Sequence, residues 1–177
     1  MSNKWKKEIL EWVKTIAVAV VLAFVITQFV RPTIVNGQSM YPTLDHNDYL
    51  IINRMSYKFG EPSKGDIIVF STNLKQENGE NKDLVKRVIA VEGDQLRIED
   101  SKVYVNGELI DEPYIHDNYT EGYVDITIPE DMMFTMGDNR ENSKDSRMSD
   151  VGLVSEDDVM GKVMIRLFPF NKIGVVK

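Results

Sequence analysis

The longest apolar stretch of the chain constrains its fold more than any other feature. Residues 15–30, TIAVAVVLAFVITQFV, contain no charged side chain and lie between Lys14 and Arg31. The run is slightly shorter than the roughly 20 residues that cross a bilayer, but both flanking cations can extend to the membrane surface, and Trp12 suits an interface. The sequence therefore predicts a transmembrane helix over residues 15–31, preceded by a basic tail at residues 1–14.

Two other interpretations of this run are a buried core helix and the apolar part of a cleaved signal peptide. A core helix is disfavoured because no face of the run is polar and because the run lies near the end of the chain. Cleavage is disfavoured because the residues that follow, QFVRPT, offer no small-x-small site. We therefore expect an anchor that is retained, with Pro32 ending the helix.

The distribution of charge indicates how this anchor is oriented. Residues 1–31 carry five basic and two acidic side chains, so their net charge is +3, whereas the whole chain carries −7. Four of the five cations precede the apolar run, which places residues 1–14 in the cytoplasm and residues 32–177 outside the cell membrane. The remaining body, at −10, lacks the clustered cations that neutralise phosphates, so no nucleic-acid partner is expected.

Thiol and metal chemistry find little support in the sequence. The chain has no cysteine, which excludes disulfides, thiolate catalysis and cysteine metal sites. Its two histidines, His46 and His116, lack a second ligand at the spacing of a metal site, and we expect both in surface loops. No metal is therefore expected.

Beyond residue 32, the pattern is one of short strands separated by turns. Runs of β-branched and aromatic residues alternate with turn signals such as Lys64-Gly65-Asp66 and Asn106-Gly107. This spacing favours a mainly β fold, an antiparallel sheet or barrel-like domain over residues 32–177, with residues 95–133 as a possible small β subdomain. The expected strands are 49–53, 66–70, 84–91, 95–98, 103–105, 124–128, 133–136 and 163–168. Residues 72–83 and 116–123 are expected to be loops, and Ser155 can cap a helical turn over residues 155–160.

Ser39 is the first candidate for chemistry. It lies within NGQSMYPTL, residues 36–44, where Gly37 permits close backbone approach and Pro42 with Thr43 stiffens the exit. A serine hydroxyl is a weak nucleophile until a base takes its proton. Most serines beside glycine and proline are ordinary turn residues, so the local sequence leaves both roles open.

Lys86 is the candidate base. On the strand 84–91, alternation places Lys86 on one face with Leu84, Val88 and Ala90. The ammonium could still reach water while its stem lies along the sheet, as is usual for strand lysines. Alternatively the amine is buried, which lowers a lysine pKa because the charged form loses hydration. A pKa lowered by about 3 units corresponds to roughly 4 kcal/mol and gives a working base near neutral pH.

Four sequence blocks resemble those of a known family. GQSMYPTL (37–44), KGDIIVF (64–70), LVKRVIAVEGD (84–94) and MGDNRENSKDSR (136–147) occur in the order and spacing of bacterial type I signal peptidases. These are membrane-anchored serine proteases that remove signal peptides from exported proteins. The resemblance runs from the anchor through residues 168–170, and it implies an antiparallel β fold, a Ser/Lys dyad, and no metal or cofactor.

The resemblance also implies a role for individual residues. Ser39 looks like the nucleophile and Lys86 like the general base, with Ser143 holding the base through a hydrogen bond. Asp145 is expected to pair with Arg147 and to hold the loop around the base.

One departure from the family concerns the oxyanion hole. The backbone N–H of Ser39 is the expected donor to the developing oxyanion. Some relatives carry a serine at the position of Gly37 and use its hydroxyl as a second donor, which glycine cannot supply.

The substrate expected from the resemblance carries small residues, usually alanine, one and three positions before the cut. A substrate bound as an added β-strand would send alternate side chains into shallow pockets. The residues that resemble the pocket lining are Val35, Met40, Leu44, Leu84 and Val85. The expected partners are preproteins that carry a signal peptide, together with the lipid bilayer.

Two other functions are compatible with parts of this pattern. One is a self-cleaving Ser/Lys protease domain like the repressors of the bacterial damage response, although the apolar span and the missing DNA-binding helices argue against it. The other is an anchored extracytoplasmic β-domain that binds peptides without cutting them.

Overall fold

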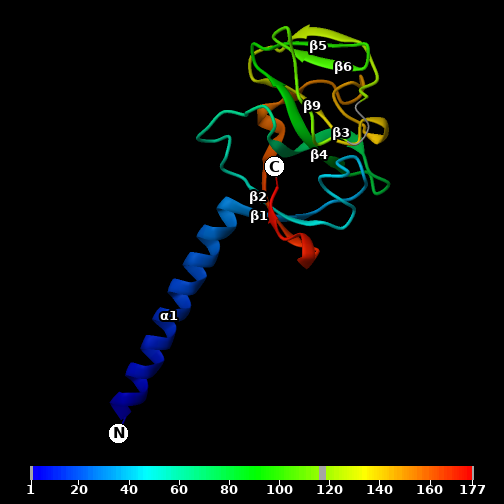
Figure 1. The fold of residues 1–177 in the computed structure, drawn as a ribbon. Helices are drawn as coiled ribbons and strands as arrows, with labels where there is room; N and C mark the ends of the chain where they lie inside the picture. Colours follow the sequence, from blue (N-terminus) through cyan, green and yellow to red (C-terminus); the bar gives the residue numbers. More distant parts are fainter. Residues whose placement is uncertain (1, 116–118, 177) are drawn as a thin grey trace.

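The amino-terminal segment forms one long helix that stands apart from the rest of the protein. A computed structural model describes residues 2–115 and 119–176. Helix α1 (Ser2–Phe29) projects away from the β-domain, and none of its apolar window is buried against the protein (Figure 1). Within Lys4–Phe29, an 18-residue window reaches a mean hydropathy of 2.3, so the helix is long and apolar enough to cross a membrane. The helix thus runs through residues 2–14 of the basic tail and through the predicted span as far as Phe29.

The helix ends earlier than Pro32, where the sequence placed its end. Strand β1 (Val30–Ile34) follows directly, and Pro32 pairs there with Ile51. A proline is tolerated in this strand because β1 lies at the edge of its sheet, where the missing N–H interrupts no central ladder.

The main sheet confirms the predicted antiparallel β fold. Its strands are ordered β1-β2-β11-β3-β4-β9-β10, and every pair is antiparallel. Strand β12 pairs with β11 off this path. The strands are β2 (Tyr49–Asn53), β3 (Ile67–Lys75), β4 (Asn81–Val91), β9 (Met132–Met136), β10 (Val154–Ser155), β11 (Val159–Phe168) and β12 (Gly174–Val175).

A second sheet of four strands lies at the end of the domain farthest from α1 (Figure 1). Its order is β7-β6-β5-β8, and it shares one hydrophobic core with β4 and β9, in which Leu96 and Phe134 take part. The expected subdomain at residues 95–133 contains this sheet. That these residues form a subdomain of their own stays a prediction. The strands are β5 (Gln95–Glu99), β6 (Lys102–Val105), β7 (Glu108–Leu109) and β8 (Val124–Thr127).

The segment 72–83, expected as a loop, is instead largely strand. It continues the β3–β4 hairpin, with Ser71 opposite Asp83 and Lys75 opposite Asn81. Most of these residues are exposed and polar, so the extension lacks the apolar alternation that reveals a strand in sequence.

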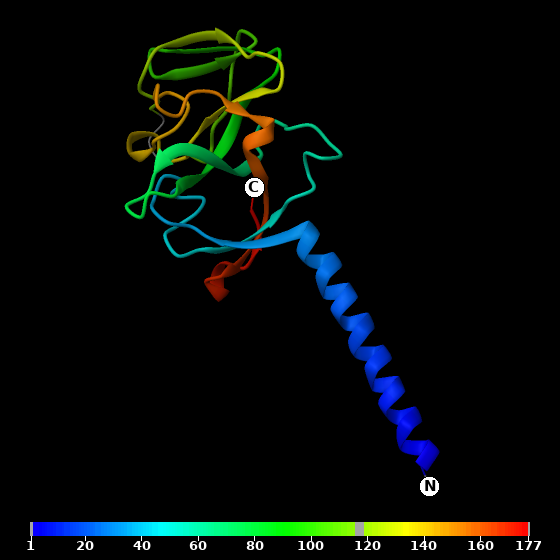
Figure 2. The same cartoon turned by 180° about the vertical axis from the view of Figure 1, so that it is seen from behind.

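The short turns complete the fold. The described residues contain three 3-10 turns, η1 (Arg140–Asn142), η2 (Glu156–Asp158) and η3 (Phe170–Lys172). The Ser155 side chain caps η2 as predicted. η3 lies at the same end of the domain as the junction with α1 (Figure 2). His116 and its neighbours 117–118 lie outside the described residues, and residues 119–123 are irregular.

Candidate active site

The turn that carries Ser39 is anchored in the protein core. Met40 and Leu44, which follow the serine, are completely buried, and the Leu44 N–H donates to the Met40 carbonyl at 2.8 Å. On the other side, Gly37 has a φ of +107°, a conformation that residues with a side chain rarely adopt. The hydroxyl of Ser39 is therefore presented from a defined turn between β1 and β2.

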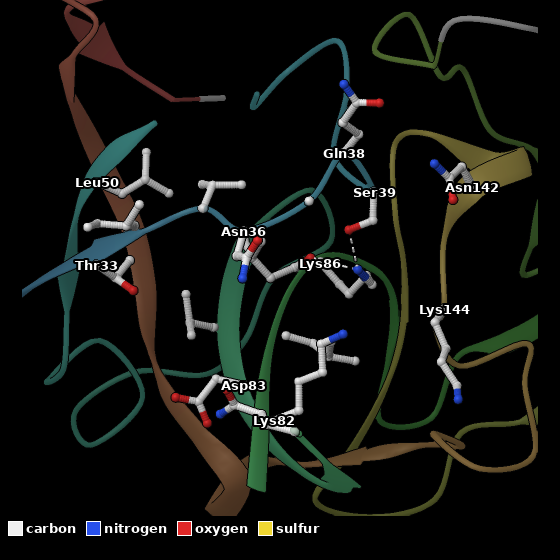
Figure 3. Close-up of a pocket in the computed structure, with 17 residues that line it drawn as sticks. Thr33, Asn36, Gln38, Ser39, Leu50, Lys82, Asp83, Lys86, Asn142 and Lys144 are labelled. Atoms are coloured by element: carbon white, nitrogen blue, oxygen red, sulfur yellow. Dashed lines mark hydrogen bonds between the residues drawn. The ribbon is translucent and has the colours of Figure 1, made fainter. Parts of the chain in front are cut away.

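Lys86 reaches this serine from the middle of β4, where it pairs with Ile68 of β3. Lys86 is 1% exposed, and its Nζ lies 2.6 Å from Ser39 Oγ and 3.0 Å from the Val85 carbonyl oxygen (Figure 3). Burial lowers the pKa of Lys86 to about 8, because the charged amine loses hydration, although the negative charge of Asp145 opposes this. A neutral amine in this position can accept the proton of the serine hydroxyl.

Asn139 ties the loop 137–147 to the serine turn, and sequence reasoning did not identify it. Its backbone N–H donates to the Ser39 carbonyl at 3.0 Å, and its side-chain Nδ2 donates to the Gln38 carbonyl at 3.1 Å. Its Oδ1 accepts the N–H of Asn142 at 3.2 Å. The only sequence signal was an asparagine within a polar block, which does not indicate a partner 101 residues away.

Asp145 and Arg147 form the ion pair that the resemblance implied. Arg147 Nε lies 2.8 Å from one carboxylate oxygen of Asp145, and Nη2 lies 2.9 Å from the other. The same carboxylate accepts the Gly137 N–H at 3.0 Å, and Arg147 also donates to the Arg140 carbonyl. Burial alone would raise the pKa of Asp145, but the hydrogen bonds and charge of Arg147 outweigh it and hold the pKa below its usual range.

Ser143 lies close to the dyad without the expected hydrogen bond. Within residues 2–115 and 119–176 its buried hydroxyl makes no hydrogen bond to Lys86, and it lies close enough to the Asp145 carboxylate to help lower the pKa of that group. A Cβ built on Gly137 would lie 2.2 Å from Ser143 Oγ and 2.3 Å from the Ser39 carbonyl oxygen. Ser143 and the Ser39 backbone therefore pack together against the face of Gly137 where a side chain would lie. The orienting role of Ser143 stays a prediction.

A second ion pair joins β4 to the same loop. Arg87 binds Asp138 through two contacts of 2.9 Å and 2.7 Å, and both side chains are buried. The Thr43 hydroxyl donates to the same carboxylate, and the Arg87 guanidinium lies 3.9 Å from the centre of the Tyr114 ring. Two adjacent residues of β4 thus have different partners: Lys86 contacts the nucleophile, and Arg87 binds Asp138 of the loop 137–147.

A groove of about 450 Å³ runs beside the dyad, between the segment before Ser39 and strand β4 (Figure 3). Of the predicted substrate-binding residues, the structure places Val35, Leu84 and Val85 in its lining. Met40 and Leu44 do not line it; they are completely buried in a core cluster that also contains Val35. Thr33, Gln38, Lys82, Asp83, Asn142 and Lys144 are among the other lining residues.

His46 lies in a surface loop, as expected, but also contacts the serine turn. Its Nδ1 accepts the Gly37 N–H at 3.2 Å. No group of three or more metal-ligating side chains occurs within the described part of the chain.

Comparisons with known proteins show which family the chain belongs to. Residues 9–168 match the family model of signal peptidase, peptidase S26. A signal peptidase IB from Staphylococcus aureus (strain COL) is 40% identical over 186 aligned residues, which cover 94% of this chain and 93% of the relative. A signal peptidase I S from Bacillus subtilis (strain 168) is 37% identical, with the same coverage of both chains.

A crystal structure of a signal peptidase I from Enterococcus faecalis V583 is 29% identical, with a TM-score of 0.47, and covers 58% of this chain and 96% of that chain. The family match over most of the chain and the identity to curated relatives do not depend on this structural similarity. The chain belongs to the signal peptidase family, peptidase S26.

Proposed function

We propose that this protein is a membrane-anchored serine endopeptidase that removes signal peptides from exported preproteins. The observation that carries the proposal is the 2.6 Å contact between Ser39 Oγ and the buried amine of Lys86. The relatives named signal peptidase support the choice of substrate.

In the first half of the reaction, neutral Lys86 takes the proton of the Ser39 hydroxyl while Oγ attacks the carbonyl carbon of the scissile peptide. The tetrahedral intermediate then collapses, the carbon–nitrogen bond breaks, and the Lys86 ammonium protonates the departing amine. The Ser39 backbone N–H is the proposed donor to the oxyanion. Because Gly37 has no hydroxyl, a second donor would have to be another group.

In the second half, Lys86 takes a proton from water, and the resulting hydroxide attacks the acyl-enzyme. The ester bond breaks, the signal peptide leaves with a new carboxyl group, and Ser39 recovers its proton from Lys86. With a pKa of about 8, roughly a tenth of the enzyme carries the neutral base at pH 7, and half carries it at pH 8.

The groove supports a peptide bound in extended form. Val35 lies on one side of it, and Leu84 and Val85 lie on the other, so a strand between them would place small side chains near apolar walls. Ser39 would then attack the carbonyl at the end of this strand, with Lys86 as its base.

The position of the membrane follows from α1 and from the surface near it. We propose that α1 spans the bilayer with its basic end in the cytoplasm. Phe168 and Phe170 are exposed, and their ring centres lie 5.4 Å apart in an edge-to-face arrangement. They lie where β11 runs into η3, and η3 is at the end of the domain that carries the α1 junction (Figure 2). An apolar surface there would rest against lipid, which would place the groove close to the segment of the preprotein that leaves the membrane.

The test is cleavage of a model preprotein by the full-length protein purified in detergent. The preprotein carries Ala-x-Ala before the cut, and the cut site is determined by mass spectrometry. Wild type should cut after the second alanine, whereas Ser39→Ala and Lys86→Ala should not, although both keep the circular dichroism spectrum of the wild type. Equal cutting by all three proteins, or none by a folded wild type, would favour a peptide-binding domain instead.

A further inference from the structure

Lys82 is a cation of the groove that has no ion-pair partner. It lies on β4 four residues before Lys86, a separation of roughly 13 Å along a strand, and both side chains line the groove (Figure 3). Within residues 2–115 and 119–176, the Lys82 ammonium makes no hydrogen bond or ion pair. Another exposed lysine of the groove, Lys144, pairs with Asp150 at 2.5 Å. Lys82 therefore presents an uncompensated charge to whatever occupies the groove.

The charge of Lys82 is directed into the groove. Figure 3 shows its side chain turned toward Lys86, whereas the carboxylate of the next residue, Asp83, turns to the opposite side of the strand. The positive charge of Lys82 is one of the influences that lower the pKa of Lys86, after burial, while Asp145 and Asp138 oppose the shift. The charge of Lys82 thus acts on Lys86 across the groove.

Along both walls of the groove the anchor side is the side away from the dyad, since Lys82 precedes Lys86 by four residues on β4 and Thr33 precedes Ser39 by six. Thr33, which lines this side, follows the last residue of α1 by only four positions. A signal peptide is embedded in the membrane before its cut site, so this segment would enter the groove beside Thr33 and Lys82 and reach Ser39 last. The substrate strand would then run parallel to β4. The substrate strand and β4 rise by a similar distance per residue. If the residue directly before the cut lies beside Lys86, the fifth residue before the cut therefore lies beside Lys82.

We propose that Lys82 is a specificity-determining residue that selects the charge of the substrate at about the fifth residue before the cut. An acidic side chain there forms an ion pair with Lys82, and a basic one is repelled. The inference rests on the proposed function and adds a preference to it. A partly exposed pair of charges changes an affinity by up to about 1 kcal/mol, so a difference of up to about fivefold between acidic and basic substrates is expected.

The experiment compares three model preproteins that differ only at the fifth residue before an Ala-x-Ala cut site, which is Glu, Gln or Lys. The full-length enzyme is assayed in an uncharged detergent as wild type, Lys82→Gln and Lys82→Glu. Lys102→Gln is the matched control, because Lys102 begins β6 in the distant sheet and the variant makes the same change in net charge. The readout is the ratio of kcat/KM for the Glu substrate to that for the Lys substrate.

Wild type and Lys102→Gln should favour the Glu substrate, Lys82→Gln should bring the ratio close to one, and Lys82→Glu should invert it. The preference of the wild type should shrink at high salt, because these charges are exposed to solvent. A ratio that is the same in wild type and Lys82→Glu would overturn the inference while leaving the proposed function intact. Failure of folded wild type to cut the neutral Gln substrate would instead overturn the proposed function.

Discussion

The Lys86 amine meets the Ser39 hydroxyl at 2.6 Å across 47 residues of chain, in a site where Lys86 is almost inaccessible to water. The strand supplies the burial, since Leu84 and Val88 on either side of Lys86 are themselves buried. Burial in the sheet therefore makes Lys86 a base, because desolvation lowers its pKa toward neutral pH.

The first prediction concerns the pH dependence of cleavage. Because the neutral form of Lys86 is the active one and its pKa is lowered to about 8, kcat/KM should rise about tenfold per pH unit below pH 7 and level off above pH 8.5. Initial rates with a model preprotein between pH 5.5 and 10 measure this rise of kcat/KM with pH. Lys86→Arg should be inactive at every pH, because a guanidinium cannot give up its proton. Activity in that variant would remove the general-base role.

The second prediction is that the burial of Lys86 costs stability. The pKa of Lys86 is about 8 in the folded protein, against 10.5 for an unperturbed lysine, so the unfolded chain binds more protons between these values and wild-type stability should rise with pH across this window. Lys86→Met removes the buried amine and should raise the free energy of unfolding at pH 7 by about 3 kcal/mol. This difference in the free energy of unfolding between the variant and the wild type should vanish near pH 10.5.

Calorimetric unfolding of the full-length protein in detergent at pH 7 and pH 10.5 tests this expectation. Lys102→Met is the control, because Lys102 is exposed on β6 and its replacement should not produce a pH-dependent difference. A stabilisation by Lys86→Met that is equal at both pH values would show that packing, rather than desolvation of a charge, is responsible.

The third prediction concerns Gly137, the first residue of the loop 137–147, which packs against the serine turn. An added Cβ would lie 2.3 Å from the Ser39 carbonyl oxygen and 2.2 Å from Ser143 Oγ, so the backbone of the serine turn must move. Gly137→Ala should lower kcat by roughly 100-fold, because a displacement of about 1 Å in the nucleophile has effects of that order. Gly174→Ala, where a Cβ meets no atom within 4 Å, should keep wild-type kinetics. Equal kcat values for the two variants would contradict the view that close packing at Gly137 positions Ser39.

Periodicity and composition predicted the elements whose residues have a strong local signal. The apolar run indicated the helix, and alternation in the buried strands, such as Tyr49–Asn53, indicated the sheet. The polar tip of the β3–β4 hairpin was missed, because exposed strands carry no apolar alternation. Met40 and Leu44 were expected beside the substrate, but their side chains turn into the core, a choice that depends on tertiary packing.

The pairing of Ser39 with Lys86 came from the resemblance to a family, since the strand pattern alone permitted an exposed lysine. Contacts made across the fold could not be predicted in this way. Arg87 and Asp138 are 51 residues apart, and Asn139 contacts Gln38 over 101 residues. Each is an ordinary polar residue in sequence, and its partner is defined only once β4 and the loop 137–147 lie together.

The last prediction concerns Asp145, whose carboxylate binds Arg147 through two contacts and the Gly137 N–H through a third. Asp145→Asn leaves the buried guanidinium without its counter-charge and should lower the free energy of unfolding at pH 7 by about 3 kcal/mol. The folded-state pKa of Asp145 is depressed, so its contribution is fully present above the unfolded pKa, near 4, and is lost as the pH falls through the lower folded value. The difference between wild type and variant should therefore be largest near neutral pH and should shrink below pH 4.

The same substitution also separates a structural role from substrate binding. Because the ion pair holds the loop beside the dyad, Asp145→Asn should lower kcat, with a smaller effect on KM. Asp150→Asn is the matched control, since Asp150 pairs with Lys144 on the surface, where both side chains are about half exposed and the ion pair contributes little. Steady-state kinetics of both variants at a pH of 8.5, where Lys86 is largely neutral, measure the effect without interference from the titration of the base. A change confined to KM in Asp145→Asn would show that the loop contacts the substrate rather than holding the base.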